Sequence, residues 1–517
     1  MTYSFNLIEQ LWIPCVHFDG RVEEFSLREA LTRAHELRGI QGDSPLETAA
    51  LYRLLLAVLH SALRGPGNRA EWGKLWAKAQ WEPDLVNDYL DKWHERFDLF
   101  HPERPFYQVA DDRAKAKSVI TLVTDMASGN NAAFFDHHTE DVGVSLSSAK
   151  AARTLIAAHN FGLAGLFLPG ATFTDAPWGR GIIFFVEGDN LFTTLALNLL
   201  AYPDEKKNNM ASSKADQPAW EKDNPHQPVR HIPAGYLDYL TWQNRRILLT
   251  PEGEENAPIV RQMTMAPGLR LDATILDPMK LYRAGKKEEG YYSTRFSEDR
   301  ALWRDSASLF GLKSVRGYFP PQTFYWLAYL VDEDAIPKAQ KHRFMALGMA
   351  NDQAKVEFFQ QEHSPLPLEY LNDVDLVETL AVALELTERT RFALKIASQW
   401  LALLVISPKS DGKKWQEVDR ISKDQAEKLM THWNVERFYW QQLDIPFQRL
   451  LEALPENPAA LNTWMETVKT AAWKSLEQAV NFAGTDTSAL KAEVRAKSIL
   501  GYSLKELFPE PQKEATV

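Results

Sequence analysis

Two histidines among carboxylates form the segment best suited to metal chemistry. Asp136, His137 and His138 are consecutive, and Glu140 and Asp141 follow directly after Thr139. Imidazoles and carboxylates together could bind a divalent ion, and a bound ion can activate water for hydrolysis. The segment therefore indicates a metal-dependent phosphoesterase as one interpretation of the chain.

The residues around this segment favour a plainer interpretation. The segment resembles the Asp-His-His element of a phosphoesterase family, but the acidic motifs that complete such a site at strand ends are not evident here. Its N-terminal neighbours are residues typical of turns, namely Ser128, Gly129, Asn130 and Asn131. We therefore expect a solvated polar loop, and the phosphoesterase stays an alternative.

Other signatures of catalysis are absent from the sequence. Gly165 and Gly170 have the spacing of a phosphate-binding loop, but Ala171 stands where that loop needs a lysine. No G-x-S-x-G, H-E-x-x-H or G-x-G-x-x-G pattern occurs. Cys15 is the only cysteine, which excludes an internal disulfide and a multi-cysteine zinc site. We expect a protein that is not an enzyme and that needs no cofactor.

Composition and charge limit the classes of partner. The 517 residues are 45% hydrophobic and 25% charged, as in an ordinary globular protein of several domains. A net charge of −11 argues against a protein that coats nucleic acid by itself, but it allows local contacts if partner subunits neutralise most phosphates. The N-terminus lacks a signal-peptide pattern, and the apolar stretches Leu51–Leu63 and Trp400–Ile406 are short. We expect a cytoplasmic protein with no membrane partner.

The chain opens with a pattern that predicts a hairpin and a helix. Residues 5–31 indicate a strand, a turn at Asp19-Gly20 and a second strand. Ser26 with Glu29 three residues later is a capping box, which predicts the start of a helix.

The rest of residues 1–370 mixes helices and strands. Helices are expected at Leu46–Arg64 and Trp72–Phe97, and strands at Gly181–Glu187 and Arg245–Thr250. The polar, proline-containing stretch 203–229 is expected to run over the surface.

The composition turns helical from Asp373 onward. A long amphipathic helix is expected up to Pro408, with Glu388 interrupting its apolar stripe. The predicted stripe consists of Val374, Val377, Ala381, Leu384, Phe392, Ile396 and Trp400.

Three further helices complete the predicted C-terminal part. The first covers about 422–443 and bends at Pro446 towards Leu454, the second covers Ala459–Phe482, and the third runs from about Asp486 to Leu500. Four helices joined by short loops predict an up-and-down bundle. The sequence therefore predicts an α+β protein with a mixed domain at 1–370 and a four-helix bundle at 371–517.

An ordered set of motifs resembles one known family. The opening segment combines Asn6-Leu7-Ile8, Trp12-Ile13-Pro14 and Ser26-Leu27, with Glu29-Ala30-Leu31 following. The later motifs are F-x-L-x-H-x-x-x-P-F at 97–106, Q-P-x-W at 217–220, G-Y-L-D-Y-L-T-W-Q at 235–243, and R-F-Y-W through I-P-F at 437–447. Together they resemble CasA, the large subunit of the type I-E CRISPR surveillance complex Cascade. The set spans nearly the whole chain.

The resemblance implies a site that reads the protospacer-adjacent motif (PAM) of double-stranded DNA. It implies that a glycine loop, here Gly162, Leu163, Ala164 and Gly165, enters the minor groove. It also implies a wedge between base pairs beyond the PAM, here Asn351, Asp352, Gln353 and Ala354, with Gln353 at the tip. Family members use a lysine before Asp277-Pro278, but residues 251–279 contain none. Arg270 is the candidate replacement.

The resemblance also gives the Asp136 loop a second interpretation. In CasA a loop here contacts the CRISPR RNA (crRNA) and the complex, and its contact residues would be Asn130, Asn131, Phe134, Phe135 and Asp136. Aromatic rings stack on bases, and asparagine both donates and accepts hydrogen bonds. Packing of Phe134 or Phe135 on the core is the alternative.

The implied function is a non-enzymatic DNA-recognition subunit. It would bind PAM-bearing double-stranded DNA, start strand separation and help recruit a helicase-nuclease, while crRNA pairing reads the remaining sequence. The implied partners are crRNA and the backbone, small and crRNA-handle-binding subunits. No zinc is expected. A purely structural scaffold subunit remains a further alternative.

Overall fold

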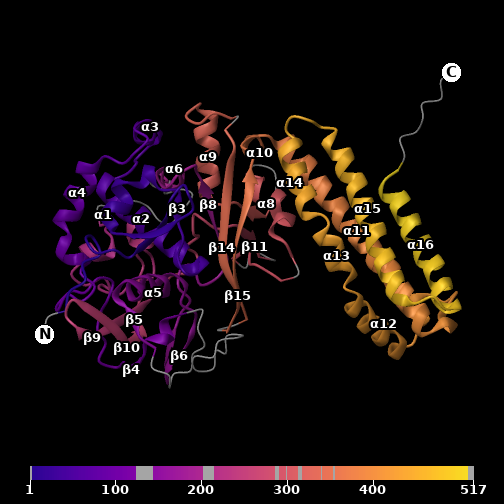
Figure 1. The fold of residues 1–517 in the computed structure, drawn as a ribbon, viewed down its shortest axis with the longest axis horizontal. Coiled ribbons are helices and arrows are strands. Elements are labelled where there is room, and N and C mark those ends of the chain that lie inside the picture. Colours follow the sequence, from indigo (N-terminus) through magenta and orange to yellow (C-terminus); the bar gives the residue numbers. More distant parts are fainter. Residues whose placement is uncertain are drawn as a thin grey trace. The chain divides into compact units, whose positions relative to one another are not determined.

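The computed structural model describes residues 3–123, 144–201, 215–285, 290–298, 300–312, 317–338, 340–352 and 355–509 (Figure 1). The chain forms two compact units. The first comprises Met1–Ser297 and Arg316–Leu368, and the second comprises Glu298–Val315 and Glu369–Val517. Sequence patterns suggested one boundary after residue 370, whereas Glu298–Val315 belongs with the second unit. Where independently folding domains begin and end stays a prediction.

The predicted hairpin and helix open the first unit. β1 (Ile13–Val16) pairs antiparallel with β2 (Val22–Phe25) and with β3 (Gly39–Ile40). In α1 (Leu27–Thr32), the Glu29 N–H donates to the Ser26 hydroxyl and the Ser26 N–H donates to the Glu29 carboxylate. This reciprocal pair satisfies two N–H groups at the helix end. The prediction for this segment is confirmed.

A buried helix lies at the centre of the first unit. α2 (Pro45–Leu63) starts after Ser44, whose side chain accepts a hydrogen bond from the Glu47 N–H. It packs against α5 (Ser148–Phe161). Among the described helices it alone is long and apolar enough to cross a membrane, and 83% of its most apolar window is buried inside the protein. This burial is that of a core helix, as the sequence predicts.

The helix predicted over Trp72–Phe97 is wrong, because this range is broken. α3 (Arg69–Ala77) and α4 (Pro83–Lys92) are separate, and His94–Phe97 is a 3-10 turn. Ala79 has a φ of 53°, which ends the first helix. Pro83 suits a helix start because its missing N–H would have no partner there.

Strands from distant parts of the sequence form the sheets of the first unit. The strands predicted at 181–187 and 245–250 are confirmed, since they lie in β8 and β9. The largest sheets join β9 (Arg245–Glu254), β4 (Ala116–Ser118) and β5 (Leu146–Ser147) around β10 (Ala257–Pro267), and β8 (Ile182–Glu187) and β15 (Lys355–Leu366) around β14 (His342–Asp352). The smaller ones join β6 (Gly165–Leu168) to β7 (Ala171–Phe173), and β12 (Tyr291–Ser293) and β13 (Tyr318–Phe319) to β11 (Tyr282–Ala284). The short helices here are α6 (Leu191–Asn198), α7 (Tyr236–Leu240) and α9 (Gln322–Asp332).

Helices build the second unit. α11 (Val374–Ile406) packs against α12 (Arg420–Trp433), α15 (Ala460–Ala483) and α16 (Thr487–Leu507). The short helices α8 (Ser306–Phe310) and α10 (Glu369–Asn372) complete it. A mixed unit followed by packed helices confirms the predicted fold class.

Two details of the predicted bundle are wrong. The helix predicted at about 422–443 with an extension to Leu454 is three helices: α12, α13 (Val435–Gln441) and α14 (Asp444–Ala453). Asn434, which has a φ of 56°, ends α12. Pro446 lies in the first turn of α14, not at a bend. On α11, Val374 and Phe392 are 37% and 57% exposed, although both were expected on the buried stripe.

Candidate nucleic-acid interface

The segment Gly162–Gly165 links α5 to the β6–β7 hairpin. The Gly162 N–H donates to the Ala158 carbonyl (3.0 Å), which ends α5, and its carbonyl accepts from the Ala176 N–H (2.7 Å). Gly165 is already the first residue of β6. The hairpin turns at Gly170, which has a φ of 82°. The glycine spacing of 165–170 therefore forms a hairpin, not a phosphate-binding loop.

Buried Arg245 holds the start of this segment. Its guanidinium donates to the carbonyls of Leu163 (2.5 Å) and Thr174 (3.2 Å) and lies over the Phe173 ring, 5.2 Å from the centroid. Burial lowers the pKa of Arg245 to about 10. A Cβ at Gly162 would lie 2.4 Å from the Arg245 Cζ atom. Glycine is therefore needed at 162 for packing against Arg245.

Gly165 has different surroundings. A Cβ placed there meets no atom within 4 Å. The next residues project from the surface, since Leu166 is 77% and Leu168 is 41% exposed. The open end of the predicted loop is therefore Gly165 and the hairpin beyond it.

Asp175 fixes the base of the same hairpin. Its carboxylate accepts from the Ala164 N–H (2.7 Å) and from the Arg180 Nε (3.0 Å). Sequence reasoning missed Arg245 and Asp175, because their roles depend on contacts between segments that the sequence alone does not bring together.

The predicted wedge residues lie at the end of the β14–β15 hairpin. Asn351 pairs with Val356, Asp352 pairs with Lys355, and the register shifts between Ala350 and Asn351. Gln353 and Ala354 lie between the two strands in sequence and are outside the described residues. A hairpin is therefore present where the resemblance implied one, and its role as a wedge stays a prediction.

The β14–β15 hairpin is connected to the glycine segment through β8. β14 pairs with β8, with Gly348 opposite Ile182, and β8 begins two residues after Arg180. A Cβ at Gly348 would lie 2.8 Å from the Gly181 carbonyl oxygen. Asp352 is four residues further along β14, or roughly 13 Å at the usual strand rise. In the view of Figure 1, β6 lies towards the bottom of the first unit, and β14 and β15 run down towards the same side.

Arg270 reaches the same neighbourhood through residues 243–245. The N–H groups of Gly268 and Leu269 donate to the carbonyls of Asn244 (2.9 Å) and Gln243 (3.0 Å). Arg245 comes next in the chain and holds Leu163. Arg270 itself is exposed. We call Gly162–Gly165, Arg270 and the turn end of the β14–β15 hairpin the loop–hairpin edge.

Lys280, the first lysine after the segment 251–279, is not placed to replace the lysine that family members use there. It is buried, and its Nζ donates to the carbonyls of Pro177 and Arg180, each at 2.6 Å. Burial lowers the pKa of its ammonium to about 8. Lys280 therefore supports the segment behind the loop–hairpin edge from inside.

The other predicted contact residues belong to one segment of the chain. Asn130, Asn131, Phe134, Phe135 and Asp136 all fall in 124–143, outside the described residues, as do His137 and His138. Among the residues that the structure does describe, no three His, Cys, Asp or Glu side chains gather as a metal-ligand set.

Comparison with known proteins identifies the family. The model of the family described as CRISPR-associated protein Cse1 matches residues 6–475. The chain belongs to the Cse1 family. It is 34% identical to the CRISPR-associated protein CasA/Cse1 of Thermus thermophilus, over 98% of each chain.

Solved structures agree in fold with this Cse1 chain. The crystal structure of Thermus thermophilus CasA aligns with a TM-score of 0.80 at 32% identity, over 97% of this chain and 99% of that one. A chain of a CRISPR RNA-guided surveillance complex aligns with a TM-score of 0.74 over 96% of this chain and 100% of that one. At 21% identity, the second match shows a shared fold.

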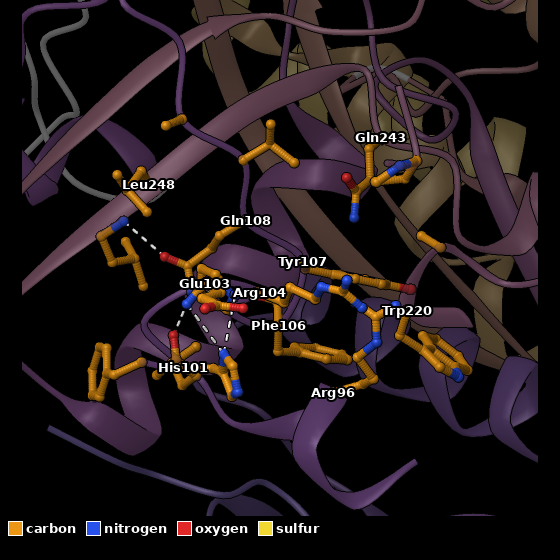
Figure 2. A pocket seen from close by; sticks show the side chains of 18 of the residues that line it. Arg96, His101, Glu103, Arg104, Phe106, Tyr107, Gln108, Trp220, Gln243 and Leu248 are labelled. Atoms are coloured by element: carbon orange, nitrogen blue, oxygen red, sulfur yellow. Dashed lines mark hydrogen bonds between the residues drawn. The ribbon is translucent and has the colours of Figure 1, made fainter. Parts of the chain in front are cut away.

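Two motifs that resemble Cse1 meet around one cavity of 480 Å³. Figure 2 shows Phe106, Tyr107 and Trp220 beside one another in its wall. The Trp220 ring lies 5.2 Å from Phe97 and 6.2 Å from Phe106, centroid to centroid. Segments 97–106 and 217–220 are therefore joined by aromatic packing.

Hydrogen bonds also join residues that line this cavity. Arg96 and Arg104 both donate to one Asp223 oxygen, each at 2.8 Å. Gln108 donates to the Leu99 carbonyl (2.6 Å) and accepts from the Leu249 N–H (2.8 Å), as Figure 2 shows in part. These contacts give the motifs at 97–106 and 217–220 a structural role, which is to hold two distant segments of the first unit together.

Proposed function

We propose that this chain is the PAM-recognising, non-enzymatic large subunit of a CRISPR RNA-guided surveillance complex. One observation supports the proposal: β14 pairs with β8, the strand that follows the glycine hairpin, and residues 268–269 before Arg270 hydrogen-bond to the segment that holds Leu163. Membership of the Cse1 family supports the CRISPR context, and the resemblance implies PAM reading for these same segments.

The chemistry of the edge suits minor-groove contact. No atom lies within 4 Å of a Cβ placed on Gly165, so a groove can approach this residue closely, and exposed Arg270 supplies positive charge. The minor groove presents a degenerate pattern, so we propose a permissive PAM preference.

The hairpin end suits the start of strand separation. We propose that Gln353, together with Asp352 and Ala354, enters between base pairs next to the PAM. Unstacking one step costs about a few kcal/mol, which contacts at the rest of the edge would offset. Pairing with crRNA then extends the opening.

The partners follow from the same role. We propose contacts with double-stranded target DNA, crRNA, the backbone, small and crRNA-handle-binding subunits, and a helicase-nuclease. The chain's net charge of −11 means that other subunits must neutralise most of the DNA phosphates.

The proposal is tested by measuring how tightly a crRNA-loaded complex binds target duplex with and without this chain. Matched and scrambled PAM duplexes are compared at one salt concentration, because affinity depends strongly on salt. We expect the chain to raise affinity for the matched PAM only. Equal gains for both duplexes would indicate a structural scaffold instead.

A further inference from the structure

The small sheet β12–β11–β13 is unusually aromatic. Five of its eight strand residues are aromatic: Tyr282, Tyr291, Tyr292, Tyr318 and Phe319. Tyr291, Tyr292 and Phe319 are 47%, 53% and 39% exposed. Exposed rings gathered in one place mark an interaction surface more often than scattered ones do.

The register places two of these rings on either side of an arginine. Arg283 lies opposite Tyr292 on one side and opposite Tyr318 on the other. Directly opposed residues of antiparallel strands project from the same face. Strands lie about 4.8 Å apart, so the two tyrosines are roughly 10 Å apart with the guanidinium between them. We call Tyr292, Arg283 and Tyr318 the Tyr-Arg-Tyr row.

The opposite face attaches the sheet to the protein. Tyr282 is buried, and its hydroxyl accepts from the Asp277 N–H at 2.8 Å. On the same face Tyr291 packs edge-on against Phe319, with the centroids 4.9 Å apart. The sheet is therefore anchored through Tyr282, and on the opposite face Tyr292 and Arg283 are exposed and Tyr318 is half-buried.

The charge of the row is positive. Arg283 is exposed, and no described residue forms an ion pair with it. No acidic residue occurs in the three strands. In a chain with a net charge of −11, this is a local reversal of sign.

The sheet is joined directly to the strand behind the loop–hairpin edge. The Ile182 N–H at the start of β8 donates to the Thr294 carbonyl (3.0 Å). A Cβ at Gly181 would lie 2.6 Å from the Ser293 Oγ. The row therefore belongs to the same rigid surroundings as the edge.

We infer that the Tyr-Arg-Tyr row is a stacking surface for single-stranded nucleic acid. The exposed Tyr292 ring and the half-buried Tyr318 ring can each take a base, and the guanidinium between them can take the phosphate that joins the bases. An acidic protein partner fits less well, because the strands offer no aliphatic side chain larger than alanine for a packed interface core. This inference goes beyond the proposed function, since reading a duplex PAM does not require it.

The test uses the full chain and a fluorescein-labelled oligodeoxythymidine of about 20 nucleotides, longer than a typical single-strand binding site, at low, fixed salt. Base stacking on one ring is worth enough that Tyr292→Leu should weaken binding by about five- to hundredfold. Tyr292→Phe keeps the ring and should bind within about twofold of the unmodified chain. Arg283→Gln should weaken binding and reduce its salt dependence, and Arg283→Lys should retain most of both.

Tyr329→Leu is the matched control. Tyr329 lies on α9 of the same unit and is 45% exposed, so its replacement should leave oligonucleotide binding unchanged. The inference is overturned if the unmodified chain does not bind the oligonucleotide, or if Tyr292→Leu binds it equally well. It is also overturned if the Tyr292→Leu variant still binds the oligonucleotide but no longer assembles into the complex, which would indicate a protein partner. Failure of PAM-dependent duplex binding, with oligonucleotide binding intact, would remove the proposed function and leave this inference standing.

Discussion

Gly162 and Gly165 are three residues apart, but the space available for a side chain differs between them. Gly162 packs against the guanidinium of Arg245 and the Ala158 carbonyl, so any side chain would collide with buried groups. Gly165 faces open space. One short motif therefore contains a glycine that packing requires and a glycine that packing does not require, and substitution distinguishes the two.

Gly162→Ala should destabilise the first unit. Forcing a methyl group into this site should cost about 1–3 kcal/mol, since Arg245 is itself held by two carbonyls. Urea unfolding measures the loss. Gly165→Ala is the control and should change stability by less than about 0.5 kcal/mol. Equal effects of the two substitutions would contradict this description of the segment.

Acid should destabilise the first unit through three buried histidines. Burial lowers the pKa of His60 and His226 to about 3 and that of His159 to about 4. Unfolded histidine titrates near 6.5, so the unfolded chain binds more protons and stability falls as the pH drops below that value. Below pH 6.5 each histidine lowers the free energy of unfolding by about 1.4 kcal/mol per pH unit. The three together lower it by roughly 5 kcal/mol between pH 7 and pH 5.

Urea unfolding at pH 7 and pH 5 checks this expectation. His159→Gln should reduce the acid-induced loss by about a third, because one of the three groups no longer titrates. Equal stability at both pH values would show that these histidines are not buried in neutral form.

At the scale of elements, Glu388 on α11 interrupts a predicted apolar stripe for a reason that the sequence does not show. Its carboxylate pairs with Arg304 and with Arg391, and the Arg304 guanidinium lies over the Trp440 ring at 3.8 Å. Arg304 comes from the segment Glu298–Val315, distant in sequence from α11. Glu388 therefore lies within the apolar stripe because it pairs with an arginine from a distant segment of the chain.

Glu388→Leu should therefore destabilise the second unit, although it would lengthen the apolar stripe. Arg304 has a side chain only 10% exposed and would lose its carboxylate, at a cost of about 1–3 kcal/mol. Thermal unfolding measures this loss of stability. Glu385→Leu is the control on the same helix, since Glu385 is 70% exposed and should tolerate the change. A gain in stability from Glu388→Leu would contradict this view.

The elements that the sequence predicted well are those defined by local chemistry. The capping box at Ser26 and the strand predicted at 181–187 each depend on neighbouring residues. The break at Ala79 and the left-handed Asn434 were missed because non-glycine residues rarely adopt a positive φ. The residues of the loop–hairpin edge were proposed from family resemblance, and Arg245, which holds Leu163, could not be found from local pattern.

At the scale of the whole molecule, the two units do not follow sequence order. Residues 298–315 lie within the first unit's range in sequence but belong to the second unit. Trp303 stacks on Phe447, with the centroids 4.5 Å apart, and its indole N–H donates to Asp444 at 2.6 Å. This segment completes the second unit.

Trp303→Ala should destabilise the second unit and not the first. The lost packing and hydrogen bond should cost about 2–4 kcal/mol. Hydrogen exchange resolves the two units separately, and we expect faster exchange in α14 and α15 with β8 and β14 unchanged. Unchanged protection in α14 would show that Trp303 is not part of that core.

PAM discrimination by the assembled, crRNA-loaded complex tests the central claim most directly. It is the ratio of affinities for matched and scrambled PAM duplex at fixed salt. Gln353→Ala, Gly165→Ala and Arg270→Gln should each lower this ratio. Gln361→Ala, an exposed glutamine on β15 away from the turn, should not. If all four variants keep the ratio of the unmodified chain, the loop–hairpin edge does not read the PAM.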